Sequence, residues 1–159
     1  MLDLLPVAQR PSHCGPSSLK IVLAYYGIQA SEKEIGRLAG TTRSKGTSAK
    51  GLLKAARTFG LKGFVKDFAD FKDLQSYVKK KIPVIVNWFS GIEGHYSVVA
   101  GLDRDNICLQ DPYLGRLRAL RWKTFRKVWF DFPSEGLHRK EDIWIRRVIV
   151  FFPIQRKKR

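Results

Sequence analysis

The chain has 159 residues, of which 44% are hydrophobic and 12% are aromatic. This composition suffices for one folded domain with an apolar core, and it excludes an intrinsically disordered chain. Lysine and arginine number 30 against 14 aspartate and glutamate residues, which gives a formal net charge of +16. The excess positive charge fits an anionic partner, such as nucleic acid or an anionic membrane, as well as it fits a solvated surface without a partner.

No membrane-spanning or secretory segment is predicted. No stretch approaches the roughly 20 apolar residues that a transmembrane helix needs, and the start of the chain lacks a signal-peptide pattern. We therefore expect a cytoplasmic protein. Its basic charge also allows it to associate with a membrane surface. The two cysteines do not form a disulfide framework and fit a reducing compartment. Without a linker or an internal repeat, the sequence predicts a single domain over residues 1–155 and a basic tail at 156–159.

The N-terminal third is predicted to be helical, from the spacing of apolar residues and from residues suited to helix caps. The expected helices run from Cys14 to Gly27, from a Ser31–Glu34 capping box to about Ala39, and from Ser48 to Gly60, with a loop over residues 40–47.

Strands dominate the rest of the chain. They are expected at residues 61–68, 82–89, 95–102, 107–111, 116–120 and 143–152. A helix is expected to start at Asp70, and a short helical turn at residues 124–130. The turns at 90–94 and 103–106 are short enough to join antiparallel neighbours. Helices followed by a mostly antiparallel sheet indicate an α+β fold.

Cys14 stands before the first turn of the predicted N-terminal helix. Unpaired amides and the positive end of the helix dipole favour an anion there, so a thiol is pushed towards its nucleophilic thiolate form. Five residues upstream, Gln9 offers an amide donor that can hold a developing oxyanion together with the Cys14 backbone amide. A cysteine at a helix start is more often a small buried residue than a nucleophile, so Cys14 alone does not establish catalysis.

A nucleophilic cysteine needs a base and a group that orients the base. Among three histidines, His95 begins an apolar strand directly after a turn, which suits the rim of a sheet. The midpoint of His95 and Asp111 falls in the predicted hairpin turn, so an antiparallel register places Asp111 nearly opposite His95. Asp103, by contrast, would lie roughly 26 Å along the same strand. We therefore expect His95 as the base and Asp111 as its orienting group.

No metal and no cofactor are expected. His13 adjoins Cys14 and His138 lies in a late polar segment, and neither has cysteine or histidine partners at the spacing of metal ligands. Cys108 lies within a short apolar strand and is expected to be buried and structural.

Together these residues resemble the bacteriocin-processing, double-glycine leader peptidase family of papain-like cysteine peptidases. The resemblance extends over nearly the whole chain and rests on Gln9, Cys14-Gly15-Pro16, Gly94-His95-Tyr96-Ser97-Val98-Val99 and Asp111-Pro112. It implies a papain-like fold with N-terminal helices packed on a mostly antiparallel sheet. It also implies that Cys14 is the nucleophile, His95 the base, Asp111 its orienter and Gln9 the oxyanion-hole donor. The implied substrate is a peptide cut after a Gly-Gly or Gly-Ala pair, and the implied partner is an ABC exporter.

The chain departs from that family in lacking the exporter's transmembrane helices and its G-x-x-x-x-G-K-[ST] phosphate loop, which suggests a free-standing member or a fragment. The leading interpretation is a cysteine peptidase with a Cys-His-Asp triad, with leader processing as the finer expectation. One alternative is a catalytically silent basic module for nucleic acid or anionic membrane, since residues 121–129 interleave aromatic and basic side chains. Helical spacing of those aromatic residues is, however, more typical of a core. Another alternative is an amidase or acyltransferase with the same triad.

Overall fold

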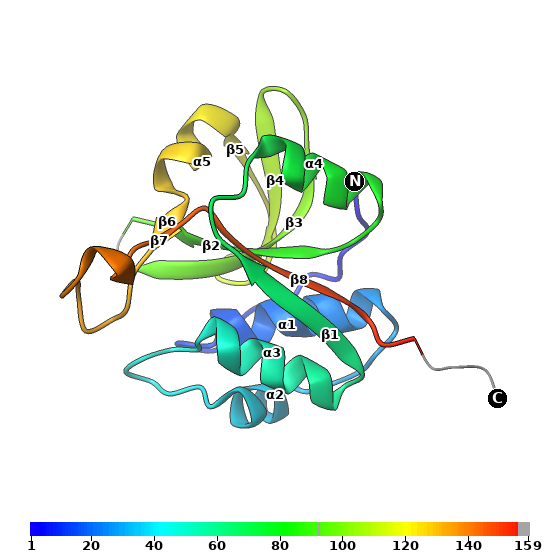
Figure 1. Cartoon of the computed structure of the whole chain (residues 1–159). Coiled ribbons are helices and arrows are strands. Elements are labelled where there is room, and N and C mark those ends of the chain that lie inside the picture. The colour runs from blue at the N-terminus through cyan, green and yellow to red at the C-terminus, as the bar shows by residue number, and fades with distance from the viewer. Residues whose placement is uncertain (92, 156–159) are drawn as a thin grey trace.

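The computed structural model describes residues 1–91 and 93–155, and the basic tail expected at 156–159 lies outside them (Figure 1). The helices are α1 (Cys14–Tyr25), α2 (Glu32–Ala39), α3 (Ala49–Thr58), α4 (Phe71–Lys79) and α5 (Trp122–Val128), with a 3-10 turn η1 (Lys140–Asp142). The strands are β1 (Leu61–Lys66), β2 (Val84–Phe89), β3 (Gly94–Leu102), β4 (Asn106–Asp111), β5 (Arg116–Arg121), β6 (Phe130–Asp131), β7 (Trp144–Ile145) and β8 (Arg147–Pro153). Within the described part of the chain, no helix is both long and apolar enough to cross a membrane.

Six strands form one antiparallel sheet in the order β1-β8-β2-β3-β4-β5, and β6 and β7 form a separate two-stranded sheet. Helices α1, α2 and α3 lie on one side of the large sheet, and α4 and α5 lie on the other (Figure 1). The helices thus precede most of the strands in the chain and cover both faces of the sheet, which confirms the predicted α+β class.

Side-chain caps start three of the helices where the sequence predicts them. Ser31 accepts a hydrogen bond from the Glu34 amide at 3.1 Å, and Ser48 accepts one from the Gly51 amide at 3.0 Å. A reciprocal capping box forms at α4 between Asp70 and Asp73 rather than at α2, where the expected box is only half made. Each cap satisfies a backbone amide that the first turn of a helix leaves unpaired.

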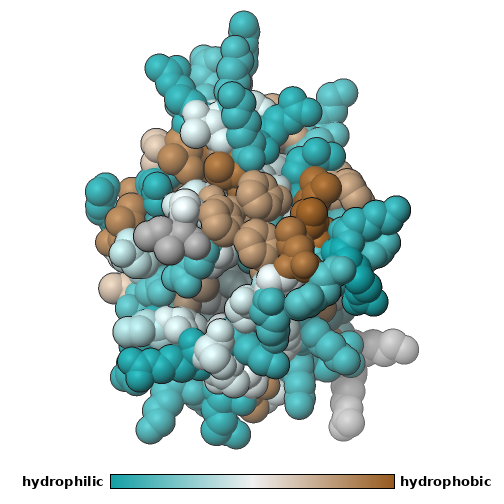
Figure 2. All heavy atoms as spheres, turned by 90° about the vertical axis from the view of Figure 1, so that its left-hand side faces the viewer, coloured by the Kyte–Doolittle hydropathy of each residue, from teal (hydrophilic) through white to brown (hydrophobic). Residues whose placement is uncertain are grey.

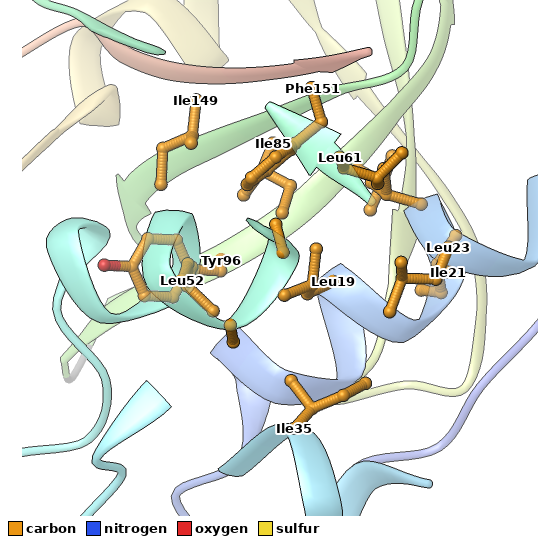
Figure 3. Close-up of a cluster of buried hydrophobic side chains, with 14 of the residues drawn as sticks. Leu19, Ile21, Leu23, Ile35, Leu52, Leu61, Ile85, Tyr96, Ile149 and Phe151 are labelled. Carbon is orange, nitrogen blue, oxygen red and sulfur yellow. The ribbon is translucent and has the colours of Figure 1, made fainter. Parts of the chain in front are cut away.

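Two apolar clusters fill the spaces on either side of the sheet. The first lies between the sheet and helices α1 to α3 (Figure 3) and includes Leu19, Ile21, Leu23, Ile35, Leu52, Leu61, Ile85, Tyr96, Ile149 and Phe151. The second lies beneath α4 and α5 and contains Leu74, Trp88, Phe125 and Trp129. Phe125 and Trp129 are fully buried, so the helical spacing of aromatic residues after residue 121 does mark a core.

Two expected elements near the C-terminus are wrong in their limits. The single strand expected at 143–152 is divided at Arg146, whose φ of 49° turns the chain from β7 into β8. Arg146 is held in this left-handed conformation by its amide, which donates to Trp129, and by its Nε atom, which donates to Ala69 at 2.8 Å. The helical turn expected at 124–130 begins earlier, at Trp122, and ends before β6. The error in the strand arises because apolar continuity does not reveal a change of sheet.

Helices α2 and α3 approach so closely at Gly51 that a Cβ atom there would collide with the Ala39 carbonyl oxygen. Gly51→Ala is therefore expected to lower the free energy of unfolding by about 1–3 kcal/mol through overpacking. The intrinsic helix propensity of alanine alone would raise it by about 1 kcal/mol. Urea unfolding measures the difference, and Lys54→Ala on the exposed side of α3 is the control. A Gly51→Ala variant as stable as the parent protein would contradict this packing.

Candidate active site

Cys14 is the first residue of α1, and its thiol is free and half-buried. The turn that follows it is fully buried, with Gly15 so close to Thr47 that a Cβ atom would lie 2.8 Å from the Thr47 Cβ. The missing side chain at position 15 therefore lets the start of α1 settle against the loop before α3. This packing places the thiol at a helix N-terminus, where the helix dipole stabilises a negative charge.

His95 and Asp111 are joined by a short hydrogen bond, with 2.6 Å between His95 Nε2 and Asp111 Oδ1. Their side chains are 7% and 0% exposed, so water competes little for this bond. The indole ring of Trp88, on the neighbouring strand β2, meets the imidazole edge to face at 5.7 Å, and its Nε1 atom donates to Ser97. The imidazole is thereby held between a carboxylate and an aromatic wall.

The strand register that brings His95 and Asp111 together differs from the one inferred from the hairpin midpoint. Val98 pairs with Gln110, which places Ser97 rather than His95 opposite Asp111. The offset arises because the hairpin turn is centred between residues 104 and 105 rather than at 103, as the pair Leu102 and Ile107 shows. A bulge at Ala100, where the register shifts between Val99 and Gly101, then reduces the offset by one residue. Diagonal neighbours on one face of a sheet remain within reach of long side chains, so the two groups still meet.

The protonation of His95 follows from its partners. Because Nε2 faces Asp111, Nδ1 is the ring nitrogen left for the Cys14 thiol, which is near enough to raise the pKa of His95. Burial by itself disfavours the charged ring, but the hydrogen bonds to Asp111 and Cys14 outweigh it and raise the pKa of His95 to about 9. Burial likewise opposes the charge on Asp111, yet the bond to His95 holds the pKa of Asp111 below its usual value. At neutral pH the pair is therefore an imidazolium and a carboxylate.

Asp111 has two further donors. The Tyr113 amide donates to Oδ1 at 2.9 Å, and Arg118 Nη1 donates to Oδ2 at 3.3 Å. Arg118 lies on β5, and the sequence analysis did not identify it as a site residue. The sequence does contain a signal for Arg118, because basic and apolar residues alternate in the predicted strand at 116–120. This alternation puts Arg118 on the same side of the strand as Arg116, the residue opposite Asp111.

Gln9 lies in the same cleft as Cys14. Its backbone amide donates to the Pro112 carbonyl oxygen at 2.9 Å, which fixes the segment before α1 beside the end of β4. The side-chain amide is held only loosely, because Nε2 reaches the Arg10 carbonyl at 3.4 Å and buried Oε1 has no hydrogen-bond partner among the described residues. The amide is therefore free to turn towards a bound oxygen.

All four expected site residues line one cleft of about 840 Å³. One wall is the loop at residues 40–48, and the other includes residues 132–135. Lys45 and Glu135 link these walls with an ion pair of 3.1 Å. A cleft of this size and lining accommodates an extended peptide segment beside the thiol.

Asp131 is a buried carboxylate in the same cleft that sequence reasoning missed. Its oxygens occupy the space of a Cβ atom at Gly94, so only glycine fits directly before His95. Burial raises the pKa of Asp131 to about 6, although the Phe132 amide donates to its Oδ1 at 2.8 Å. Asp131 stands next to Phe130 in the sequence, and no local pattern distinguishes it from a surface residue.

The other candidate residues lie apart from this cleft. His13 caps α1 only as backbone, and its Nδ1 atom lies 2.8 Å from the Pro11 carbonyl oxygen. Cys108 was expected to be buried but is only half-buried, and this partial burial raises the pKa of its thiol. The residues described by the structure contain no group of three side chains suited to a metal ion.

The chain is similar to known proteins over most of its length. A family model described as the peptidase C39 family matches residues 6–132. An uncharacterized protein of Methanothermobacter thermautotrophicus is 34% identical over 129 residues, which is 80% of this chain and 83% of that protein. The transport/processing ATP-binding protein ComA of Streptococcus pneumoniae is 33% identical over 73% of this chain, a match that spans only 16% of ComA.

The crystal structure of the peptidase domain of Streptococcus ComA superposes with a TM-score of 0.75 at 25% identity, covering 96% of this chain and 99% of that domain. This similarity confirms the predicted fold, with N-terminal helices on a mostly antiparallel sheet.

The raised pKa of Asp131 can be tested through the pH dependence of the free energy of unfolding. Between its unfolded pKa of about 4 and its folded pKa of about 6, the folded protein binds a proton that the unfolded chain does not. The contribution of Asp131 to the stability of the parent protein therefore falls as pH rises through this interval. An asparagine at this position does not titrate, so Asp131→Asn is expected to gain about 1–3 kcal/mol relative to the parent between about pH 4 and about pH 7.

Urea unfolding at several pH values measures this gain. Asp103→Asn is the contrasting variant, because hydrogen bonds from the Asp105 and Asn106 amides lower the pKa of Asp103. Its stability must not rise with pH relative to the parent. A difference between parent and Asp131→Asn that is the same at every pH would contradict the raised pKa.

Proposed function

Because the chain belongs to the peptidase C39 family of papain-like, bacteriocin-processing cysteine peptidases, we propose that it cleaves peptide bonds with Cys14, His95 and Asp111. The observation that supports this most directly is the imidazole between two partners, with Asp111 on Nε2 and the Cys14 thiol within reach of the ring. This order of nucleophile, base and orienting carboxylate is what thiol acylation requires.

The reaction starts from a thiolate and an imidazolium. The negative sulfur is stabilised by the N-terminus of α1 and by the positive charge of His95. The Cys14 sulfur attacks the scissile carbonyl carbon, and the carbonyl oxygen becomes an oxyanion. His95 then gives its proton to the departing amine, which breaks the carbon–nitrogen bond and leaves a thioester on Cys14.

Hydrolysis of the thioester completes the cycle. Neutral His95 takes a proton from water as the water oxygen attacks the acyl carbon, and the thiolate leaves as the acid product forms. Asp111 keeps the ring oriented through both proton transfers, because its carboxylate is anchored by the Tyr113 amide and by Arg118 as well as by His95.

Gln9 is the proposed oxyanion donor together with the Cys14 backbone amide. Its side chain lies in the cleft and is tied only by one long hydrogen bond. The first amides of a helix have no partner within the helix, so the Cys14 amide is also available to a substrate oxygen. Both donors thus approach the thiol from the side of the N-terminal segment.

We infer that the substrate is a leader peptide cut after a Gly-Gly or Gly-Ala pair, as the family resemblance implies. The name of ComA, a transport/processing protein, supports an exporter in the same system. The face with the cleft loops also carries an apolar patch amid hydrophilic surroundings (Figure 2). Phe89, Phe130 and Phe132 stack near this cleft, and Leu137 and Ile143 are exposed close to them in sequence. Apolar side chains of a peptide can pack on such a surface.

Reactivity of the thiol tests the chemistry without a known substrate. Limited iodoacetamide is expected to modify Cys14 rapidly at about pH 5 to 6, where an ordinary thiol is mostly protonated. His95→Ala must abolish this acidic reactivity, because the positive partner is lost. Peptide mass spectrometry separates Cys14 from Cys108, which serves as the internal control. Slow labelling with an ordinary thiol profile in the parent protein would refute the proposed ion pair.

Cleavage of synthetic peptides tests the reaction and its specificity. Peptides with a Gly-Gly pair after an amphipathic leader should be cut after the second glycine, and replacement of that pair by two leucines should prevent cleavage. Cys14→Ala is expected to be inactive, and Gln9→Ala to be slower by roughly 10²–10³, the cost of one oxyanion donor. Gln75→Ala on α4 is the matched control. Undiminished cleavage by Gln9→Ala would remove Gln9 from the mechanism, and transfer of the acyl group to an added amine would indicate an acyltransferase.

A further inference from the structure

The pair of His95 and Asp111 is extended by a third charged side chain, Arg118, into a row of three charges. His95, Asp111 and Arg118 follow one another, with His95 on one carboxylate oxygen and Arg118 on the other. The two contacts come from different strands, since His95 begins β3 and Arg118 lies in the middle of β5. Two cationic groups therefore share a carboxylate that is wholly buried.

The position of Arg118 is determined by more than its bond to Asp111. Its guanidinium lies over the Trp88 ring at 5.3 Å, and the same indole meets the His95 imidazole at 5.7 Å. Trp88 is almost completely buried and donates to Ser97 at 3.1 Å, so its ring is a fixed platform. A planar guanidinium stacks on an aromatic face and still donates in its own plane, which an ammonium group cannot do.

We propose that Arg118 is a positioning residue for the catalytic pair: it shares the Asp111 carboxylate with His95 and so limits how strongly that carboxylate holds the imidazolium proton. The proposal rests on the proposed function, because the proton in question is the one that His95 gives to the leaving amine. An imidazolium bound to an unshared, buried carboxylate would be a poor acid. With Arg118 present, the proton is easier to release while Asp111 remains ionised.

Other titratable or charged groups surround this row. They are Cys14 on α1, Tyr96 on β3, Tyr113 in the turn after β4, Arg116 on β5, Asp131 on β6 and Arg147 at the start of β8. Among the described residues, Arg118 is the only arginine or lysine that forms a hydrogen bond or ion pair with Asp111. Arg116 stands directly opposite Asp111 in the strand register but is exposed and makes no such bond.

The test is the titration of the His95 ring by nitrogen-15 NMR in the full chain, with Cys14→Ala to separate the ring from the thiol. Only three histidines need to be assigned. Arg118→Met is expected to raise the pKa of His95 by about half a unit to one unit, because the carboxylate then interacts with His95 alone. Arg118→Lys, which keeps the charge but not the stacking on Trp88, should restore part of the parent value. Arg116→Met, which removes the same charge from the same strand, should leave the pKa of His95 unchanged.

Each other outcome overturns the proposal. An unchanged pKa in Arg118→Met would make Arg118 a surface cation, and a lowered pKa would mean that Arg118 mainly keeps Asp111 in place. An equal rise in Arg116→Met would indicate a general effect of net charge. Arg118→Gln provides a polar substitute if the methionine variant does not fold. The parent protein's iodoacetamide profile judges the peptidase mechanism separately, because ring titration in Cys14→Ala does not depend on a reactive thiol.

Discussion

The packing of α1 against β3 is the contact on which the site depends. Helix α1 carries Cys14 at its first residue, and β3 carries His95 near its start, so the two groups meet only when these elements cross at the correct height. The small residues that follow Cys14 are all buried, namely Gly15, Ser17 and Ser18, and Gly15 packs against Thr47. The hydroxyls of both serines lack hydrogen-bond partners among the described residues, which costs free energy that the surrounding apolar contacts offset.

Buried charge is the second constraint. A carboxylate as enclosed as Asp111 is tolerated only if its oxygens are satisfied, because the desolvation of an unpaired ion costs several kcal/mol. Here Oδ1 accepts from His95 and from the Tyr113 amide, while Oδ2 accepts from Arg118. Three segments of the chain therefore converge on one side chain, and the same bonds that stabilise the fold set the charge state of His95.

Local signals explain why much of the architecture was predictable. Ser48 and Asp70 start helices as their cap chemistry indicates, and Cys14 opens α1 as its position before an apolar run suggests. The tertiary contacts were beyond such signals. Arg118 is one of many arginines until β5 pairs with β4. Asp131 acquires its buried environment only when it packs directly against Gly94 at the start of β3. The bulge at Ala100 is likewise invisible in the sequence, because residues 98–102 are apolar or small throughout and show no alternation that a bulge would interrupt.

The ion pair between Lys45 and Glu135 is a weak link between the two walls of the cleft. These side chains are 68% and 51% exposed, and an exposed ion pair of that kind contributes little to stability and is screened by salt. Thermal motion and salt therefore act on this contact more readily than on the buried bond between His95 and Asp111. Higher ionic strength therefore weakens the ion pair between the two cleft loops, whereas the pair of His95 and Asp111 is buried and screened much less.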